Sequence, residues 1–417
     1  MEVRSSLVDL LDRLKESGMN LSLDNIRGCF DRLELMAPQA SVITIAGTNG
    51  KGTCAAILES LGKQSGYKVG VFTSPHLHDV TERIRIDQVN ISEAKLYGYL
   101  KTIQNKMGEG SLSYFEILAC AALMAFAEAG CDLLILEAGL GGRLDAMNAL
   151  DFSKTKQYIS VITSIGLDHQ AWLGYTRTAI MQEKLGYSRE GFPLVLGEMM
   201  MPEKGEALLT KTKAKCYRIV KDFFIENNEW GVKGDRTITV PKNKWVESSV
   251  ACALKAYQLL GGRLSTSLLN KAFQRTLLPG RCEFRKIGSQ EWVFDVAHNS
   301  ESLEMLAKQL NQDKDFRCVI ILAMRADKNV FPGLECLGKL SMGWVWVQSI
   351  FGSPQESVDK YLQCHPAKVE YLRDVLTTVK QVLNSKADKV LVTGSFLTVQ
   401  AFQDVCQVQH IKEVRTT

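Results

Sequence analysis

The chain has 417 residues, of which 46% are hydrophobic and 23% are charged, a composition that predicts a soluble globular protein with two or three domains. The 50 basic and 46 acidic side chains leave a formal net charge of +4, which excludes a nucleic-acid-binding protein that depends on bulk positive charge. The longest apolar run is too short to span a membrane, and residues 1–15 lack the apolar core of a signal peptide. The eleven cysteines include no Cys-x-x-Cys pair and are expected to be reduced thiols. We therefore expect a cytoplasmic protein whose partners include neither nucleic acid nor a membrane.

Hydrophobic periodicity predicts an α/β fold in which strands and helices alternate along the chain. Helices are expected at 5–16, 23–34, 53–65, 92–106, 114–129, from 176 onward, 246–260 and 266–275. Strands are expected at 42–46, 68–73, 81–86, 131–137, 158–165 and 192–196. Short runs between 216 and 240 predict a small β-meander.

The strand at 42–46 runs into Gly47-Thr48-Asn49-Gly50-Lys51-Gly52-Thr53, where the next helix begins. Backbone N–H groups at a helix N-terminus bind anions, and Lys51 adds a positive charge. The stretch departs from the common P-loop pattern, because Gly52 separates Lys51 from Thr53 and Ile45 replaces the first glycine. We interpret it as a phosphate-binding loop, and a glycine turn without a ligand is the alternative.

Polar residues follow three further strands, where ligands bind in open parallel sheets. The three segments that follow these strands are Ser74-Pro75-His76-Leu77-His78-Asp79, the glycine-rich run from Glu137 to Asn148, and Gly166-Leu167-Asp168-His169. Glu137 is a candidate Mg²⁺ ligand beside the phosphate loop, with a solvated strand-end charge as the alternative. Taken alone, the His-x-His sequence is a ligand-facing or solvated loop, and Lys184 is an ordinary helical lysine.

Leu278-Pro279-Gly280-Arg281 is a chain break that we take as a domain boundary. The expected domains are therefore 1–279 and 280–417. In the second domain, strands are expected at 292–296, 318–323, 344–348 and 389–393, with helices between them.

A series of motifs in the same order along the chain resembles those of the folylpolyglutamate synthase/dihydrofolate synthase family of the Mur ligase superfamily. In the first domain they are 46–53, Ser74-Pro75-His76-Leu77, Tyr114-Phe115-Glu116, 137–148, Asp168-His169 with Leu173-Gly174, and Glu183-Lys184. In the second they are Pro279-Gly280-Arg281, Asp295-Val296-Ala297-His298-Asn299, Asp327-Lys328 and Thr393-Gly394-Ser395. The family's phosphate loop includes the additional glycine that Gly52 provides.

The resemblance implies a P-loop ATPase domain like the central domain of Mur ligases, followed by a smaller Rossmann-like C-terminal ligase domain. It implies an enzyme of folate biosynthesis and one-carbon metabolism that joins L-glutamate to dihydropteroate, to reduced folates, or to both. The carboxylate of the acceptor would attack the γ-phosphate of ATP to give an acyl phosphate, which the glutamate amine then attacks. Phosphoryl transfer of this kind depends on positioning and on neutralising negative charge. A cytoplasmic monomer is expected.

The resemblance also implies roles for individual residues. The nucleotide would contact Gly47, Thr48, Asn49, Gly50, Lys51, Gly52, Thr53, Arg281, Asp295, His298 and Asn299. Mg²⁺, expected as two ions, would be held by Thr53, Glu137, His169 and a carbamylated Lys184, and Lys51, His169 and Lys184 would be the catalytic residues. The folate would contact Ser74, Pro75, His76, Leu77, Phe115, Asp145 and Ala146.

Several positions depart from the family pattern. Lys244-Trp245 and Ser248 align with the usual His-Gln and Asn on the adenine side. Met147 replaces Thr, Asn329 replaces Asp, and Val296 and Ser300 replace Gly and Pro. Two alternatives remain open: a Mur-type ligase with a non-folate substrate, and a catalytically silent nucleotide-binding protein. Cell-wall Mur ligases carry a separate domain before the phosphate loop, and only 46 residues precede Gly47 here, which favours the folate enzyme.

Overall fold

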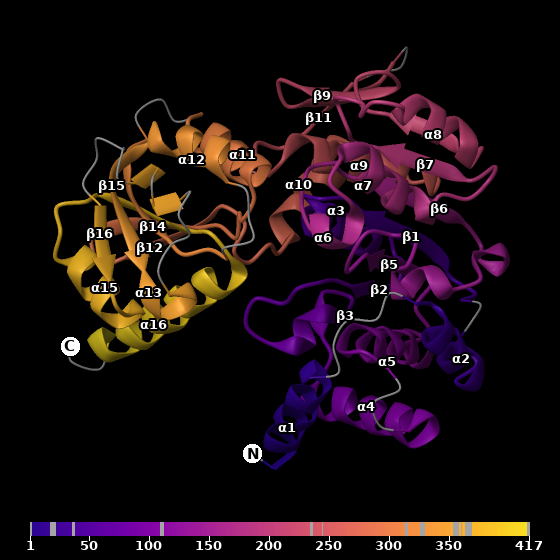
Figure 1. The fold of residues 1–417 in the computed structure, drawn as a ribbon. Helices are drawn as coiled ribbons and strands as arrows, with labels where there is room; N and C mark the ends of the chain where they lie inside the picture. The colour runs from indigo at the N-terminus through magenta and orange to yellow at the C-terminus, as the bar shows by residue number, and fades with distance from the viewer. Residues whose placement is uncertain are drawn as a thin grey trace. The chain divides into compact units, whose positions relative to one another are not determined.

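The computed structural model describes residues 2–16, 22–35, 38–108, 112–233, 237–243, 245–312, 316–325, 330–352, 358–359, 361–362 and 369–414. The chain divides into two compact units, and the second begins, apart from residues 244–246, at Leu278. Each unit is an α/β structure built on its own sheet (Figure 1). Lys244, Asp327, Lys328 and Asn329, which were singled out in the sequence, lie outside the described residues.

The first unit contains an eight-stranded sheet with β1 near its centre. Across the sheet the strands are β4 (Val89–Asn90), β3 (Ile84–Ile86), β2 (Val69–Phe72), β5 (Leu133–Glu137), β1 (Ser41–Ala46), β6 (Tyr158–Ile162), β7 (Pro193–Leu196) and β8 (Lys215–Arg218). The run from β2 to β8 is parallel, β3 is antiparallel to β2, and β4 is antiparallel to β3. All six residues of β1 are buried, as expected for a parallel strand covered on both faces.

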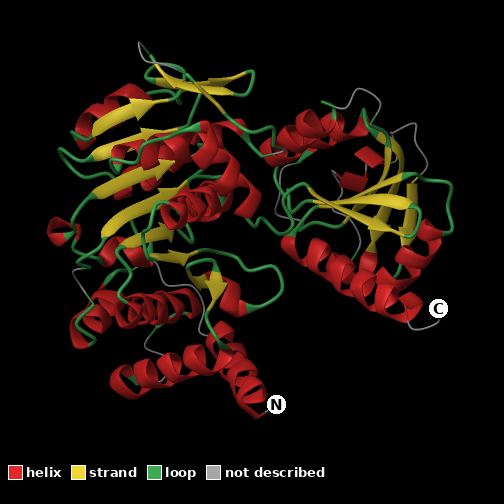
Figure 2. Ribbon diagram, turned by 180° about the vertical axis from the view of Figure 1, so that it is seen from behind, coloured by secondary structure: helices red, strands yellow, loops and turns green. Residues whose placement is uncertain are grey.

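Helices pack on both faces of this sheet (Figure 2). The helices of this unit are α1 (Glu2–Glu16), α2 (Asp24–Arg32), α3 (Lys51–Gln64), α4 (Glu93–Met107), α5 (Tyr114–Ala129), α6 (Gln170–Leu173), α7 (Arg177–Lys184), α8 (Gly205–Thr212), α9 (Glu247–Leu259) and α10 (Thr266–Arg275). Short 3₁₀ turns are η1 (Val80–Arg83), η2 (Ala146–Ala149), η3 (Phe152–Lys154) and η4 (Leu185–Tyr187). No described helix is long and apolar enough to cross a bilayer.

The second unit contains a six-stranded sheet, antiparallel only at β12. Its strand order is β12 (Glu283–Ile287), β13 (Gln290–Phe294), β17 (Lys389–Thr393), β14 (Cys318–Leu322), β15 (Ser341–Val347) and β16 (Val369–Leu372). Its helices include α11 (Ser300–Leu310), α12 (Phe331–Gly338), α13 (Gln348–Phe351), α15 (Val375–Leu383) and α16 (Phe396–Val414). The α/β class expected from the sequence is confirmed in both units.

Two local predictions are wrong. The strand expected at 81–86 is confined to β3, because the Asp79 side chain caps a 3₁₀ turn over Val80–Arg83. The meander expected from 216 onward begins later, since β8 pairs with β7 in the large sheet. Only β9 (Phe223–Glu226), β10 (Glu229–Val232) and β11 (Ile238–Thr239) form the separate antiparallel sheet.

Candidate active site

The phosphate loop leaves β1 at the centre of the sheet. Ile45 of β1 lies beside Glu137 of β5, and Ala46 lies beside Ile162 of β6. The loops that follow these three parallel strands therefore meet at one edge of the sheet, where α/β proteins bind ligands.

Glycine is required at two positions of the phosphate loop. Gly47 and Gly50 have φ angles of 149° and 82°, which side-chain-bearing residues rarely adopt. A Cβ atom on Gly47 would lie 1.9 Å from the Thr163 hydroxyl, and one on Gly50 would lie 1.9 Å from the Ser249 hydroxyl. The loop therefore packs directly against the chain after β6 and against α9.

Hydrogen bonds to residues 163–166 fix the loop conformation. The Thr48 N–H donates to the Ser164 carbonyl (3.0 Å), and the Asn49 N–H donates to the Ser164 hydroxyl (2.9 Å). The Thr163 hydroxyl donates to the Asn49 carbonyl (2.6 Å), and the Gly166 N–H donates to the Thr48 hydroxyl (2.9 Å). The cradle is thus preformed, which lowers the conformational cost of binding an anion.

Lys51 lies at the start of the 14-residue helix α3, whose N-cap Gly50 provides no side-chain cap. The Lys51 ammonium donates to the carbonyls of Gly47 (3.0 Å) and Thr48 (3.3 Å). The helix N-terminus and this ammonium together form an anion site of the kind that binds phosphate.

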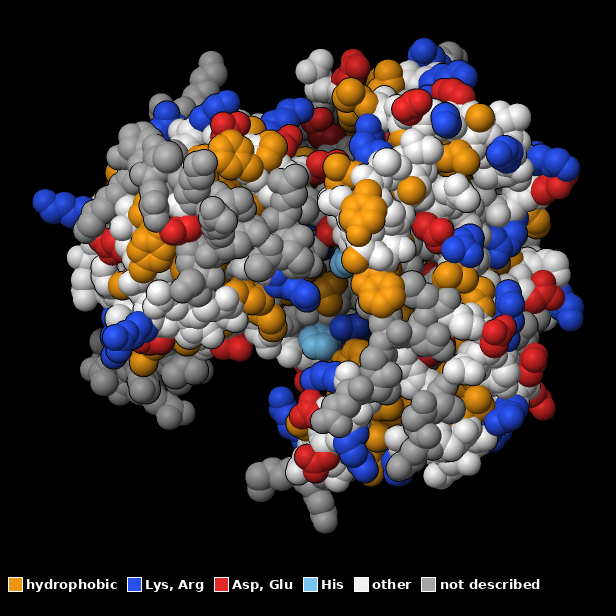
Figure 3. Space-filling view, in the orientation of Figure 1, with side chains coloured by type: hydrophobic (Ala, Val, Ile, Leu, Met, Phe, Trp, Pro, Cys, Tyr) orange, Lys and Arg blue, Asp and Glu red, His pale blue; other side chains and the backbone are white. Residues whose placement is uncertain are grey.

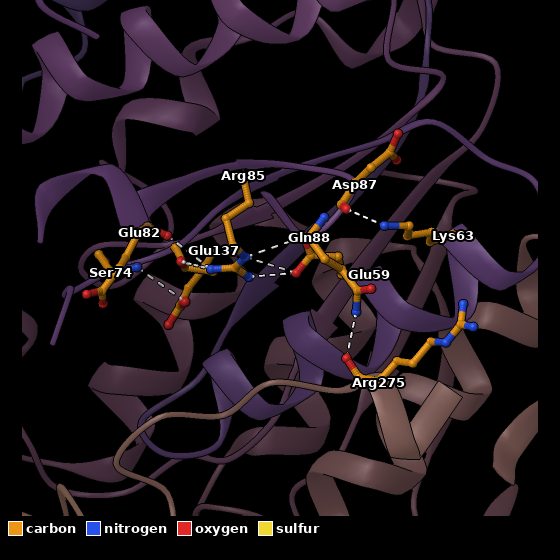
Figure 4. Close-up of polar contacts among 10 residues, drawn as sticks. Glu59, Lys63, Ser74, Glu82, Arg85, Asp87, Gln88, Glu137 and Arg275 are labelled. Atoms are coloured by element: carbon orange, nitrogen blue, oxygen red, sulfur yellow. Dashed lines mark hydrogen bonds and ion pairs between the residues drawn. The ribbon is translucent and has the colours of Figure 1, made fainter. Parts of the chain in front are cut away.

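Glu137 lies directly beside the phosphate loop. Its side chain is 3% exposed, and its Oε2 accepts a hydrogen bond from the Ser74 N–H (3.3 Å) (Figure 4). The same oxygen is 3.9 Å from the position that a Cβ on Gly52 would occupy, and Thr53 is buried in the next position of α3. Buried carboxylates in proteins are paired with a charge or coordinate a metal, and carboxylate oxygens are ligands that a hard divalent cation prefers.

The other two predicted metal ligands occupy different environments. His169 is exposed, with a left-handed backbone (φ 51°) at the start of α6, and its N–H donates to the Asp168 carboxylate (2.8 Å). Lys184 ends α7 and is 3% exposed. Within the described parts of the chain, no three His, Cys, Asp or Glu side chains form a metal site.

The loop after β2 is organised by the Glu82 carboxylate. This carboxylate accepts hydrogen bonds from the backbone N–H groups of Leu77, His78 and Asp79, each at 2.8 Å. Ser74, Pro75 and Leu77 therefore belong to a preformed loop whose first residue contacts Glu137.

His76 is part of this loop, and its Nδ1 accepts a hydrogen bond from Nε of Arg83 (2.9 Å). Arg83 in turn lies over the Tyr114 ring, 5.3 Å from its centroid. Burial, followed by the Arg83 charge, lowers the pKa of His76 from 6.5 to about 4. His76 is therefore held neutral as the acceptor of an arginine, which argues against a metal-binding His-x-His pair.

The lowered pKa of His76 predicts a pH-dependent stability. Between about pH 6.5 and pH 4 the unfolded chain binds a proton at this position and the folded chain does not. The free energy of unfolding should therefore fall as the pH is lowered through this window. We expect His76→Gln, which keeps an acceptor for Arg83, to show a smaller loss of Tm between about pH 7 and pH 4.5. Equal losses of Tm in wild type and variant would contradict this role of His76.

The predicted folate residues Phe115 and Asp145 are connected through Gly139. The Phe115 ring packs on Phe72 at 5.3 Å between centroids, and a Cβ on Gly139 would lie 2.6 Å from the Phe115 ring. The Asp145 carboxylate accepts from the Gly139 N–H (2.8 Å), and Ala146 follows, buried, in η2. Burial raises the pKa of Asp145. Phe115, Asp145 and Ala146 thus lie on one continuous set of contacts in the first unit.

Sequence reasoning missed the ion pair that joins α3 to the β3–β4 hairpin (Figure 4). Glu59 is 3% exposed and pairs with Arg85 (2.9 Å), which also donates to the Thr73 hydroxyl (3.1 Å). The Gln88 N–H donates to the same Glu59 carboxylate (3.1 Å). These contacts connect the phosphate-loop helix to the strand that precedes Ser74. The alternating Arg and Ile residues in the sequence did not indicate these contacts.

The second unit gathers the other predicted nucleotide residues at the carboxyl end of its sheet. Asp295 follows β13, and its carboxylate accepts from the N–H groups of Cys282 (2.7 Å) and Ala297 (2.8 Å). Burial raises the pKa of Asp295, and the nearby Arg281 charge opposes that rise.

Arg281 and His298 share an aromatic neighbour. The Arg281 guanidinium lies 5.3 Å from the Phe396 ring centroid, and the His298 ring lies 6.3 Å from it. The Asn299 side chain caps α11 by accepting from the Ser302 N–H (2.9 Å). Arg281, Asp295 and His298 are thus clustered in this unit, whereas the Asn299 side chain is engaged in a helix cap.

On the face drawn in Figure 3, basic and acidic side chains of the described residues are interspersed. Long-range attraction of a polyanion would need a surface dominated by positive charge. The visible surface is therefore in keeping with recognition at local anion sites.

Comparison with family models found no match. The chain is, however, 32% identical over 408 residues to the dihydrofolate synthase/folylpolyglutamate synthase of Escherichia coli K12, covering 96% of this chain and 95% of that protein. It is also 32% identical over 441 residues to the protein of the same name from Haemophilus influenzae, covering 98% and 99%.

Solved structures agree with these relatives. A bifunctional folylpolyglutamate synthase/dihydrofolate synthase with Mn, AMPPNP and L-glutamate bound matches with a TM-score of 0.86 at 33% identity, over 97% of this chain and 98% of that one. Escherichia coli FolC in complex with DHPP and ADP matches with a TM-score of 0.85 at 30% identity, over 99% and 98%.

The two-unit α/β fold, the phosphate loop and these matches define an ATP-dependent acid–amino-acid ligase with the Mur ligase fold. The chain belongs to the dihydrofolate synthase/folylpolyglutamate synthase family. The resemblance inferred from the motifs is thereby confirmed, as are the predicted fold class and enzyme class.

Proposed function

We propose that this chain joins L-glutamate to the carboxylate of dihydropteroate and of reduced folates, with ATP converted to ADP and phosphate. One observation carries the proposal. Glu137, which lies beside Gly52 of the phosphate loop, accepts a hydrogen bond from Ser74, the first residue of the loop after β2. An anion site for ATP thus adjoins the residues predicted to hold the pterin. The names of the relatives support the two acceptor substrates.

In the proposed reaction, an oxygen of the acceptor carboxylate forms a bond to the γ-phosphorus and ADP leaves. The glutamate amine then attacks the acyl carbon, phosphate leaves with the bonding electrons, and the amine loses a proton. Lys51 would move from the carbonyls of Gly47 and Thr48 to the β/γ-phosphates, where it offsets negative charge. The backbone N–H groups of residues 47–53 would hold the same phosphates.

Thr53, Glu137 and His169 would hold Mg²⁺, with His169 as the neutral imidazole. The ion would neutralise phosphate charge in the transition state. We further propose that Lys184, buried at the end of α7, carries a carbamate that helps to hold a second ion. Carbamylation replaces a buried cation with oxygen ligands suited to Mg²⁺.

We assign residues 1–279 as the ATP-binding domain and 280–417 as the glutamate ligase domain. Arg281, Asp295, His298 and Asn299 of the second domain would bind the nucleotide. Ser74, Pro75, His76, Leu77, Phe115, Asp145 and Ala146 would line the folate site. We propose a monomer that acts in the cytoplasm.

The function is tested by phosphate release from ATP in the presence of Mg²⁺ and L-glutamate. We expect release to require dihydropteroate or a reduced folate. Phosphate release that does not depend on either pterin would contradict the proposal, and so would the absence of phosphate release with both. The second result would favour the alternative, a catalytically silent nucleotide-binding protein. This alternative is suggested by Ser248, which stands where the family usually has Asn.

A further inference from the structure

The 139–147 loop is held by one buried carboxylate. Asp145 accepts from the N–H groups of Gly139 (2.8 Å) and Leu140 (3.3 Å) at Oδ2, and from the Met147 N–H (3.1 Å) at Oδ1. The fourth donor, also to Oδ1, is the Tyr187 hydroxyl (2.5 Å). An ionised carboxylate offers about four acceptor positions, so these four donors fill the acceptor capacity of Asp145.

Tyr187 differs from the other three donors in where it comes from. The backbone donors belong to the loop itself and only close it locally. Tyr187 lies 42 residues further along the chain, at the end of η4, and its side chain is fully buried. Its hydroxyl therefore ties the loop to the segment that follows Lys184.

That segment and the loop also pack backbone against backbone. The Arg143 N–H donates to the Glu183 carbonyl (2.8 Å), and a Cβ on Gly142 would lie 2.9 Å from the Lys184 carbonyl. A Cβ on Gly186 would lie 2.2 Å from the Cα of Arg143. The loop can therefore adopt this position only when it is held closely against residues 183–187.

The other side of the loop faces Phe115, because Gly139 packs on that ring. Displacing the loop would release Phe115 and shift Ala146, both of which are assigned to the folate site. We propose that Tyr187 is a positioning residue: its hydroxyl, through Asp145, holds the 139–147 loop in the conformation that receives the pterin-bearing substrate. This inference rests on the proposed function. It also assigns Asp145 to organising the loop, since its acceptor positions are occupied by the protein.

The test compares Tyr187→Phe with Tyr158→Phe. Tyr158 is equally buried and belongs to the same hydrogen-bond chain, since its hydroxyl bonds to Thr44 (2.9 Å) and donates to the Tyr187 carbonyl (2.5 Å). The control therefore loses a buried tyrosine hydroxyl without removing a donor to Asp145. KM for dihydropteroate and for ATP, kcat and Tm are measured for both variants and wild type.

We expect Tyr187→Phe to raise KM for dihydropteroate about tenfold, since a loop that is competent one-tenth of the time weakens apparent affinity by that factor. KM for ATP should change less than about twofold in Tyr187→Phe, and Tyr158→Phe should leave KM for dihydropteroate near the wild-type value. If the hydroxyl had a purely structural role, Tyr187→Phe would lower Tm but would not raise KM for dihydropteroate more than KM for ATP.

Amide hydrogen exchange of residues 139–147 provides a readout independent of turnover. It should become faster in Tyr187→Phe and not in Tyr158→Phe. Unchanged exchange and unchanged KM for dihydropteroate in a folded Tyr187→Phe protein would overturn the inference. So would the same rise of KM in the Tyr158→Phe control. Failure of the proposed function is distinguishable, because wild type itself would then show no turnover with dihydropteroate.

Discussion

Lys51→Ala is expected to reduce kcat on the order of 10²- to 10³-fold, the loss that removing one transition-state charge contact gives. In the structure the ammonium donates to the carbonyls of Gly47 and Thr48, next to the N-terminus of α3. The variant removes the positive charge of the phosphate loop and leaves the buried helix face unchanged. The measurement is steady-state phosphate release at saturating ATP, glutamate and dihydropteroate, with Tm as the check on folding.

Lys63→Ala is the matched control for Lys51. It lies in the last turn of the same helix, and its ammonium donates to the Asp87 carbonyl (2.5 Å), away from the loop. We expect near-normal kcat for this control. Turnover of Lys51→Ala within a few-fold of wild type would show that Lys51 does not bind the transferred phosphate.

Lys184→Ala is expected to lower activity on the order of 100-fold, as for the removal of groups that support a metal site. Because the proposed carbamate provides oxygen ligands, added short-chain carboxylic acids should partly restore turnover by occupying the vacated space. The measurement is kcat of the variant as a function of the concentration of acetate or propionate. Normal turnover of the variant would contradict the second-metal role.

Lys255→Ala is the control for the general effect of removing a buried lysine. Lys255 is 5% exposed, on α9, and its ammonium lies over the Tyr217 ring and donates to Gln258 (2.9 Å). Carboxylic acids should not activate this variant. Equal activation of both variants would mean that the acids act elsewhere on the enzyme.

The sequence predicts the long periodic elements well. The helix expected at 114–129 coincides with α5, because Ser113 and Glu116 form a capping box at its start and Gly130 adopts the left-handed conformation at its end. The edge strands β12 and β16 were not predicted. Their half-exposed residues, such as those of Glu283–Ile287, show little hydrophobic pattern, and their pairing depends on distant strands.

The sequence motifs predicted individual residues of the candidate site, but they did not predict the contacts between those residues. Glycines and Lys51 form a local motif, so the phosphate loop could be read from the chain. The environment of Asp145 could not, since its fourth donor, Tyr187, is distant in sequence and carries no motif. The neutral state of His76 also depends on burial and on Arg83, which only the fold reveals. The metal, nucleotide and folate assignments of individual residues stay predictions.

The most direct test of the central claim is mass spectrometry of a reaction with dihydropteroate whose carboxylate carries oxygen-18. The account predicts a product that carries one additional glutamate residue. It also predicts that the released phosphate contains one oxygen-18 atom, because the carboxylate oxygen that attacks ATP leaves with the phosphorus. A reduced folate in the parallel reaction should be extended in the same way. Phosphate without the label, or ATP consumption without a glutamylated product, would contradict the account.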